Sequence, residues 1–230
     1  MSYYAVREGR QPGIYDTWAE CAAQVTGYSG AKFRKFDSEE EAALYFQDDE
    51  PENPLPIKNN IPFAYIDGSY SKTAGRYGYG GYINNAGAIH IIQGTGSNPE
   101  YINERNIAGE VFGTLATIYR AVNLGIKELI IYHDYAGISE WSRDAWRAKS
   151  PLAVHYKQML DLCRDDIALY FVHVKGHTGI EGNEIADYLA KEAVGAKLRK
   201  KDIAALKGFK EAAAAGRVFS LSAEEREAAQ

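Results

Sequence analysis

Cysteine is scarce in this 230-residue chain, which has only Cys21 and Cys163, far apart in the sequence. A disulfide framework or a cysteine zinc site needs several cysteines at short, regular spacings. Both cysteines fall in segments with a helical pattern. We therefore expect two reduced thiols that pack as small apolar groups.

An excess of positive charge is also missing, because 31 acidic residues outnumber 26 Lys and Arg and leave a formal net charge of -5. Proteins that bind nucleic acid through bulk charge are strongly basic. Any contact between this chain and nucleic acid must therefore come from local patches of side chains.

Long hydrophobic runs are absent as well, and charged residues occur within the first ten positions. We therefore expect no signal peptide and no membrane span. The chain is 46% hydrophobic and 12% aromatic, which predicts a packed core. Our expectation is a cytoplasmic protein, a monomer without an obligate protein partner.

Four parts are visible along the chain. Residues 48–61 are rich in Pro, Asn and acidic residues without a hydrophobic period, which is typical of a linker. They separate a short N-terminal domain, residues 1–47, from a longer one, residues 62–194. A charged tail follows, residues 195–230. We expect the tail to form one or two marginal helices outside the main core, with its charges solvated. A binding role for the tail is the less favoured alternative.

The two domains have different patterns. In the N-terminal domain, three apolar-aromatic runs and two capping boxes, at Thr17 with Glu20 and at Ser38 with Glu41, predict a three-stranded antiparallel sheet with two helices. In the longer domain, three strand-like runs precede an alternation of helix and strand. This order predicts an α/β fold, a mixed five-stranded sheet flanked by helices.

Four carboxylates in the longer domain stand at positions where chemistry is common. Asp67 and Asp134 follow apolar strand-like runs, whereas Glu110 and Asp187 lie in the first turns of expected helices. Taken singly, the two strand-end residues could be turn residues and the two helix residues could favour the positive end of the helix dipole.

Taken together, these four carboxylates indicate a metal site. Carboxylates that converge repel one another and are tolerated when divalent cations neutralise them. A cluster with only oxygen ligands suits Mg²⁺, with Mn²⁺ as a substitute. Two such ions about 4 Å apart can cleave a phosphodiester, one activating water and the other stabilising the leaving oxygen.

His177 lies between glycines, in a loop with few side chains, directly before the last expected helix. A histidine in a mobile loop can take up a proton near neutral pH and leave with the product. The alternative is a turn histidine without a task. The remaining histidines lie within strand or helix runs and are given a structural role.

The motifs YIDGSY, NIAGE, YHD and VKGHTGIEGNEIADYLA, in this order over Pro62 to Val194, resemble a type 1 ribonuclease H. The resemblance implies hydrolysis of the RNA strand of RNA/DNA hybrids with two Mg²⁺ ions. It implies that Asp67 bridges the ions, that Glu110 and Asp134 complete the leaving-group side, and that Asp187 holds the ion that activates water. His177 would assist proton movement and product release.

Further positions follow from the same resemblance. Asn106 and Asn183 match positions near the substrate backbone, and Glu184 matches an acid beside the metal ligands. The chain departs from some bacterial members in one region. Where those members have a basic helical protrusion that grips the substrate, residues 137–160 are short and only mildly basic.

The N-terminal domain resembles the hybrid-binding domain of eukaryotic-type ribonucleases H, which also occurs in viroplasmin-like proteins. The resemblance implies that Trp18, Arg34 and Lys35 bind the DNA strand of the hybrid. Independently, the run KFRKF places cations among aromatics, and Trp18 offers a flat face for a sugar or base. We expect Phe33 and Phe36 to be core residues.

Two other functional classes compete with this interpretation. An integrase, transposase or junction nuclease would share the acidic cluster and the fold, but the VKGHTG loop and the N-terminal domain disfavour it. A catalytically weak or inactive protein that binds hybrids or double-stranded RNA would be marked by loss of an acidic position. All four acidic positions are present.

Overall fold

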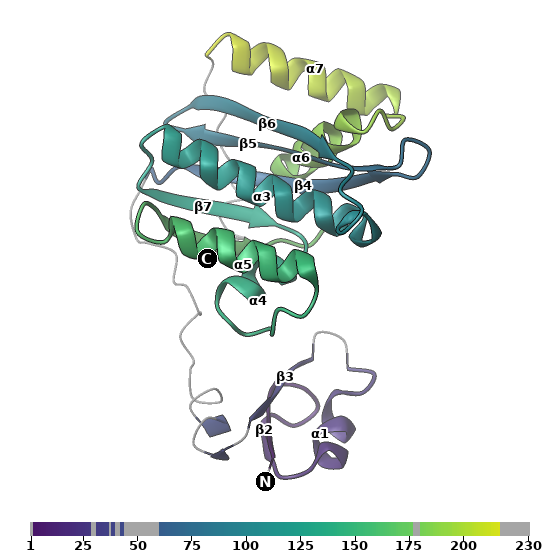
Figure 1. Ribbon diagram of the computed structural model, residues 1–230, viewed down its shortest axis with the longest axis vertical. Helices are drawn as coiled ribbons and strands as arrows, with labels where there is room; N and C mark the ends of the chain where they lie inside the picture. The colour runs from purple at the N-terminus through teal and green to yellow at the C-terminus, as the bar shows by residue number, and fades with distance from the viewer. Residues whose placement is uncertain are drawn as a thin grey trace. The chain divides into compact units, whose positions relative to one another are not determined.

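The computed structural model describes residues 2–28, 31–36, 38–39, 42–43, 60–176 and 180–216. The chain forms two compact units, Met1–Pro54 and Leu55–Gln230. Each unit has its own sheet and its own hydrophobic core (Figure 1). None of the helices in the described ranges is long and apolar enough to cross a membrane.

The first unit is a small antiparallel sheet with one described helix against it. Its strands, in the order β2-β1-β3, are β1 (Tyr3–Glu8), β2 (Gly13–Tyr15) and β3 (Lys32–Phe36). Helix α1 (Trp18–Val25) begins at the predicted capping box, where the Thr17 hydroxyl accepts from the Glu20 backbone N–H at 3.3 Å. The helix predicted from Ser38 and the linker lie largely outside the described residues.

The second unit contains the predicted mixed five-stranded sheet. Its strands lie in the order β6-β5-β4-β7-β8, with bounds β4 (Phe63–Ser71), β5 (Arg76–Asn85), β6 (Ala88–Gly96), β7 (Glu128–His133) and β8 (Ala168–His173). The first three strands form an antiparallel meander, and β7 and β8 continue the sheet parallel to β4. The parallel half brings the carboxyl ends of β4 and β7 to the same side of the sheet.

Helices cover both faces of this sheet. Side chains alternate along a strand, so in β4 the buried Ile66 faces one core and the buried Tyr65 faces the other. Helices α3 (Asn106–Asn123) and α5 (Pro151–Cys163) close the first core, and α6 (Glu181–Ala193) closes the second. Two short helices, η1 (Ile102–Glu104) and α4 (Gly137–Ser142), were not predicted because neither is long enough to show a helical period.

The charged tail is not outside the core, which corrects the sequence-based expectation. Helix α7 (Lys200–Ala214) buries Leu206 and Phe209, each 3% exposed, against the second face of the sheet. The Phe209 ring lies 4.9 Å from the ring of Tyr82 in β5, measured between centroids. Two apolar residues three positions apart are enough to dock one face of the helix, although its other faces are charged. The predicted capping box at Ser222 lies outside the described residues.

Candidate active site

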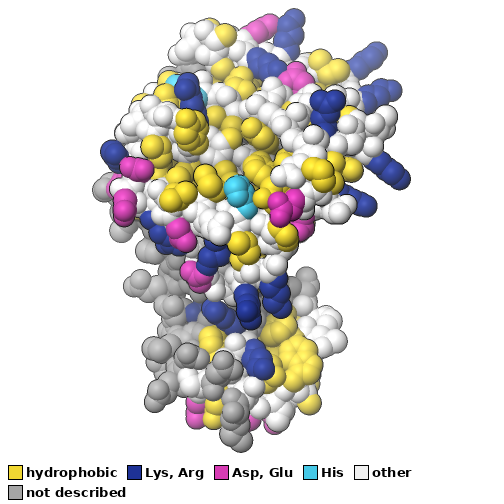
Figure 2. All heavy atoms as spheres, in the orientation of Figure 1, with side chains coloured by type: hydrophobic (Ala, Val, Ile, Leu, Met, Phe, Trp, Pro, Cys, Tyr) yellow, Lys and Arg dark blue, Asp and Glu magenta, His cyan; other side chains and the backbone are white. Residues whose placement is uncertain are grey.

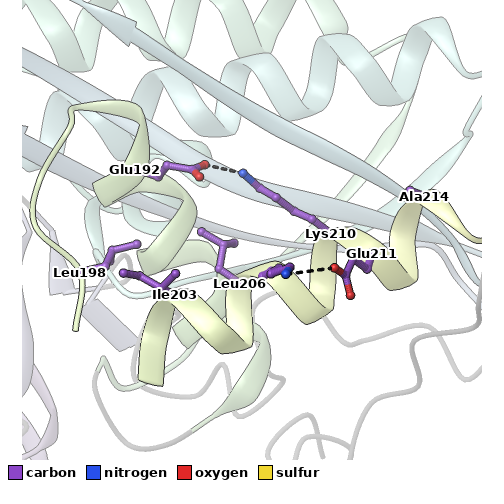
Figure 3. A pocket seen from close by; sticks show the side chains of 8 residues that line it. Glu192, Leu198, Ile203, Leu206, Lys210, Glu211 and Ala214 are labelled. Atoms are coloured by element: carbon purple, nitrogen blue, oxygen red, sulfur yellow. Dashed lines mark hydrogen bonds and ion pairs between the residues drawn. The ribbon is translucent and has the colours of Figure 1, made fainter. Parts of the chain in front are cut away.

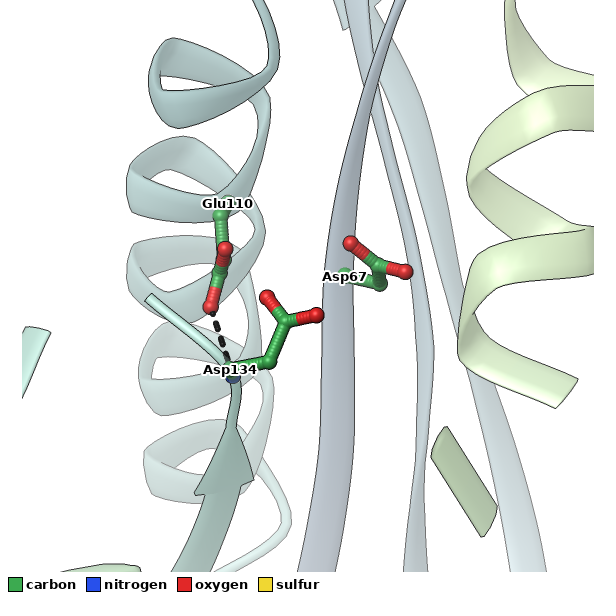
Figure 4. A group of neighbouring side chains, drawn as sticks. All are labelled: Asp67, Glu110 and Asp134. Carbon is green, nitrogen blue, oxygen red and sulfur yellow. Dashed lines mark hydrogen bonds between the residues drawn. The ribbon is translucent and has the colours of Figure 1, made fainter. Parts of the chain in front are cut away.

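Asp67, Glu110 and Asp134 meet at one point of the second unit. Asp67 lies within β4, Glu110 lies in the second turn of α3, and Asp134 follows the last residue of β7. Each of the three offers a carboxylate oxygen, and these oxygens all lie within 4.8 Å of one another. Figure 4 shows the three side chains converging from the strand, the helix and the strand end.

Glycines bring the helix close enough to the sheet for this meeting. A Cβ on Gly68, next to Asp67, would lie 2.1 Å from the carbonyl oxygen of Asn106. A Cβ on Gly109, next to Glu110, would lie 2.1 Å from the carbonyl oxygen of Gly78 in β5. Because no side chain separates them, α3 packs against β4 and β5 at backbone contact. Glu110 is thereby held beside Asp67.

Hydrogen bonds fix the Glu110 carboxylate and the chain that carries Asp134. Glu110 Oε1 accepts from the backbone N–H groups of Asp134 at 3.2 Å and of Tyr135 at 3.0 Å. The neighbouring His133 is fully buried, and burial lowers the pKa of its imidazole to about 3, so the ring is neutral. Its Nδ1 lies 3.0 Å from the carbonyl oxygen of Tyr135, to which it donates as the N–H tautomer. His133 therefore has a structural role, as predicted: it holds the turn that follows β7.

Burial and mutual repulsion make the cluster costly to ionise. Burial raises the pKa of Asp67 well above its ordinary value, and the charges of Asp134 and Asp187 raise it further. Burial likewise raises the pKa of Glu110, and Asp134 and Asp67 add to that rise. Acidic groups held so close in a buried site favour a bound cation or a proton. The cluster is therefore suited to divalent metal ions.

The cost of ionising these carboxylates should be measurable in the stability of the fold. Because folding raises the pKa of both Asp67 and Glu110, their protons stabilise the fold fully below about pH 4, and this stabilisation is lost as the pH rises toward the raised values. We expect Mg²⁺ at tenfold its Kd to add about 1.4 kcal/mol at neutral pH. That gain corresponds to a rise of about 3 to 6 °C in the melting temperature.

The melting temperature should respond less to Mg²⁺ at about pH 5, where protons compete with the ion for the carboxylates. Potassium chloride at matched ionic strength serves as the control for general screening. An equal rise with Mg²⁺ at both pH values, or with potassium, would show that the ion acts elsewhere on the chain.

Asp187, the fourth predicted ligand, stands outside the group of three. It lies in α6, where its Oδ2 accepts from Lys191 Nζ at 2.6 Å. It is nonetheless close enough for its charge to raise the pKa of Asp67, and the charge of Lys191 lowers that pKa. In this structure the lysine one turn along α6 neutralises Asp187, as the i, i+4 spacing favours.

The other predicted residues of this unit have different surroundings. Asn183 in the first turn of α6 is only 3% exposed, and its Oδ1 has no hydrogen-bond partner among the described residues. Asn106 begins α3 and is exposed. Glu184 accepts from the hydroxyl of Tyr188 at 3.2 Å. His177 lies outside the described residues.

An aromatic surface with nearby cations marks the first unit. Trp18 is 51% exposed and Phe33 is 41% exposed, and their ring centroids lie 5.7 Å apart. Phe33 is thus not the core residue we expected. It lies on β3 at the edge of a sheet of only three strands. Arg34 and Lys35 follow it and are exposed, and Figure 2 shows Lys and Arg beside the apolar surface of this unit.

Two features of these sites were missed at the level of sequence. Phe33 could not be separated from core aromatics, because the short run KFRKF does not alternate apolar and polar residues and so does not indicate which face is buried. Lys191 could have been found, since it stands four positions after Asp187 on the same helix.

Known proteins match both units. Residues 2–46 match the family model of the ribonuclease H1 N-terminal domain, and residues 59–195 match that of RNase H. Mouse ribonuclease H1 is 25% identical over 256 residues, covering 83% of this chain and 88% of the mouse protein. A ribonuclease H of Saccharomyces cerevisiae is 58% identical over 44 residues, which are 19% of this chain and 13% of the yeast protein.

Solved structures are similar as well. The crystal structure of RNase H1 from Halobacterium salinarum aligns with a TM-score of 0.49 at 21% identity, covering 58% of this chain and 97% of that one. The RNase H family model alone spans more than half of the residues and includes all of the acidic cluster. The chain therefore belongs to the ribonuclease H family of enzymes.

Proposed function

We propose that this ribonuclease H hydrolyses the RNA strand of RNA/DNA hybrids at the site formed by Asp67, Glu110 and Asp134. The observation that carries the proposal is the convergence of these three carboxylates within 4.8 Å. Two of them are buried, with pKa values raised by burial and by their neighbours. The hybrid as substrate is supported by membership of the family and by the match of residues 2–46 to the ribonuclease H1 N-terminal domain.

The residues present fit divalent cations of the Mg²⁺ type. All the donors are carboxylate oxygens, which suit Mg²⁺ or Mn²⁺ better than zinc. When bound, two such ions supply an activated water and neutralise charge on the leaving oxygen. Asp67, Glu110 and Asp134 would hold them, and Asp187 would join once Lys191 releases its carboxylate.

The remaining residues position groups and move protons. The backbone N–H groups of Asp134 and Tyr135 orient the Glu110 carboxylate before substrate arrives. Asn183, whose buried amide oxygen has no hydrogen-bond partner among the described residues, would lie near the substrate backbone. We assign His177 the proton transfer that accompanies product release.

The first unit would anchor the hybrid by its backbone. Trp18 and Phe33 offer flat faces for deoxyribose or bases, and Arg34 and Lys35 can neutralise phosphates. The RNA strand carries 2′-hydroxyls and the DNA strand lacks them. Contacts to the sugars of both strands therefore select a hybrid over either pure duplex.

Replacing Trp18 by alanine should weaken hybrid binding by about 1 to 3 kcal/mol, because a stacking face is lost. Fluorescence anisotropy with a long labelled hybrid in EDTA measures the change. Tyr28→Ala is the matched control, since Tyr28 is 42% exposed on the same unit and makes no ring contact among the described residues. Equal losses in the two variants would remove Trp18 from the binding surface.

A substrate panel tests the proposed function as a whole. One labelled sequence is presented in Mg²⁺ as an RNA/DNA hybrid, an RNA duplex, a DNA duplex and single-stranded RNA. We expect cleavage of the RNA strand in the hybrid only. Cleavage of the DNA duplex would instead favour a DNA nuclease or recombinase activity. Binding without cleavage of any substrate would favour an inactive hybrid-binding protein.

A further inference from the structure

Helix α7 and the residues just before it lie beyond the residues matched by the RNase H family model and carry two groups of cations. In the first group, Arg199, Lys207 and Lys210 each pair with an acid: Asp202, Glu211 and Glu192 respectively. The second group is Lys197, Lys200 and Lys201, all exposed. Within the described ranges of the chain, none of these three lysines forms an ion pair. We call them the α7 lysine patch.

The patch lies where positive charge is unfavourable for the helix itself. Lys200 and Lys201 are the first two residues of α7, at the positive end of its dipole, where acidic residues are favoured. The acid of this turn, Asp202, is held by Arg199 through Nε at 2.7 Å and a second guanidinium nitrogen at 3.0 Å. Lysines that are unfavourable for their own helix and form no compensating contact are expected where they serve a function.

Helix α7 also lies beside the helix that carries Asp187. Leu206 of α7 is buried in the same core cluster as Tyr188, the residue after Asp187 in α6. Lys210 continues the contact with α6 one turn later, and Figure 3 shows Lys210 reaching Glu192. In Figure 1, α7 begins on the side toward which β7 runs, where Asp134 follows the strand. Lys and Arg gather along this edge of the unit in Figure 2.

We propose that the α7 lysine patch binds the phosphate backbone of the nucleic-acid duplex beyond the point of cleavage. The inference rests on the proposed function, because it takes the duplex to be the hybrid substrate. Three unpaired point charges without an interleaved aromatic residue are suited to phosphates and not to base edges. The patch also supplies local positive charge in a chain whose net charge is -5 and would otherwise repel a polyanion.

The salt dependence of binding tests the patch directly. Each phosphate contact contributes about 0.9 to the slope of log Kobs against log salt concentration. The double substitution Lys200→Gln and Lys201→Gln in the full chain should therefore make the slope shallower by about 1.8 for a long hybrid in EDTA. At about 0.1 M salt we expect binding to weaken by roughly tenfold.

The matched control is Lys207→Gln with Lys210→Gln, which removes the same charge from the same helix but from lysines already paired with acids. Its slope should stay unchanged. The Lys200 and Lys201 variant should melt no lower than the unmodified chain, because it removes cations from the positive end of a helix. Equal changes of slope in both double variants would overturn the proposal, as would no change in either.

Cleavage of a short hybrid separates this inference from the proposed function. A duplex that covers only the acidic cluster should be cut equally by the unmodified chain and the Lys200 and Lys201 variant. Normal cutting together with unchanged slopes would refute the patch and leave the enzyme assignment standing. A shallower slope for a chain that cuts no hybrid would support the patch and refute the proposed function.

Discussion

Replacing Asp67 by asparagine should reduce cleavage of the RNA strand in a hybrid by about a thousandfold, a loss of about 4 kcal/mol of transition-state stabilisation. Asp67 is 7% exposed, and its charge is opposed by burial and by the neighbouring acids. Asparagine keeps the shape of the side chain but removes the negative charge that attracts the cation. Single-turnover cleavage of a labelled hybrid in Mg²⁺ measures the effect.

Hybrid binding by the Asp67→Asn variant should stay within a few-fold of that of the unmodified chain, because the anchoring residues are untouched. The matched control is Asp161→Asn, which makes the same chemical change at an exposed carboxylate of α5 paired with Arg164. That variant should cleave normally. Substantial cleavage by Asp67→Asn would show that the three carboxylates do not form the reaction centre.

Replacing Gly109 by alanine should destabilise the second unit by more than about 3 kcal/mol, beyond the usual cost of a single substitution. The added Cβ would lie 2.1 Å from the carbonyl oxygen of Gly78 and 3.1 Å from the Cα of Gly68. All of these are backbone atoms, so no side chain can move aside to make room. Helix α3 would have to shift away from β4 and β5, and Glu110 would move with it.

Urea unfolding measures the loss, and cleavage under conditions where the variant is still folded measures the displacement of Glu110. Gly208→Ala is the matched control, because Gly208 lies inside α7 and a Cβ there would meet nothing within 4 Å. Alanine there should stabilise the chain by about 0.5 to 1 kcal/mol. A Gly109→Ala chain as stable as the unmodified one would contradict the close contact between α3 and the sheet.

The strand pattern was sufficient to predict the sheet and its carboxylates. Apolar runs that lead to Asp67 and Asp134 identify the two strands, although Asp67 lies within β4 and not at its end, where the sequence had indicated it. The helical period from Ile107 places Glu110 on the helix that packs on the sheet. The pattern does not contain distances, so the backbone hydrogen bonds to Glu110 and the contact of Gly109 with Gly78 appear only in the folded chain.

Tertiary contacts also decide the two corrected expectations. Phe33 and Leu206 both lie in segments rich in Lys and Arg, yet Phe33 is exposed at the edge of a small sheet and Leu206 is buried against a large one. From composition alone we expected α7 to lie outside the core. That expectation was wrong because a few apolar residues dock a helix whose remaining surface is charged. The pairing of Asp187 with Lys191 shows the same limit, since the sequence indicates a ligand and the structure shows its counter-ion.

The claim that Asp67, Glu110 and Asp134 hold the divalent ions of catalysis is tested most directly by withdrawing the ions from the unmodified chain. The measurement is the cleavage rate of a labelled RNA strand in a hybrid, first in Mg²⁺, then with excess EDTA, then after Mg²⁺ is restored. We predict cleavage in Mg²⁺, loss of cleavage with excess EDTA, and full return of cleavage when Mg²⁺ is restored. Cleavage that continues at an undiminished rate in EDTA would contradict a metal site at these three carboxylates.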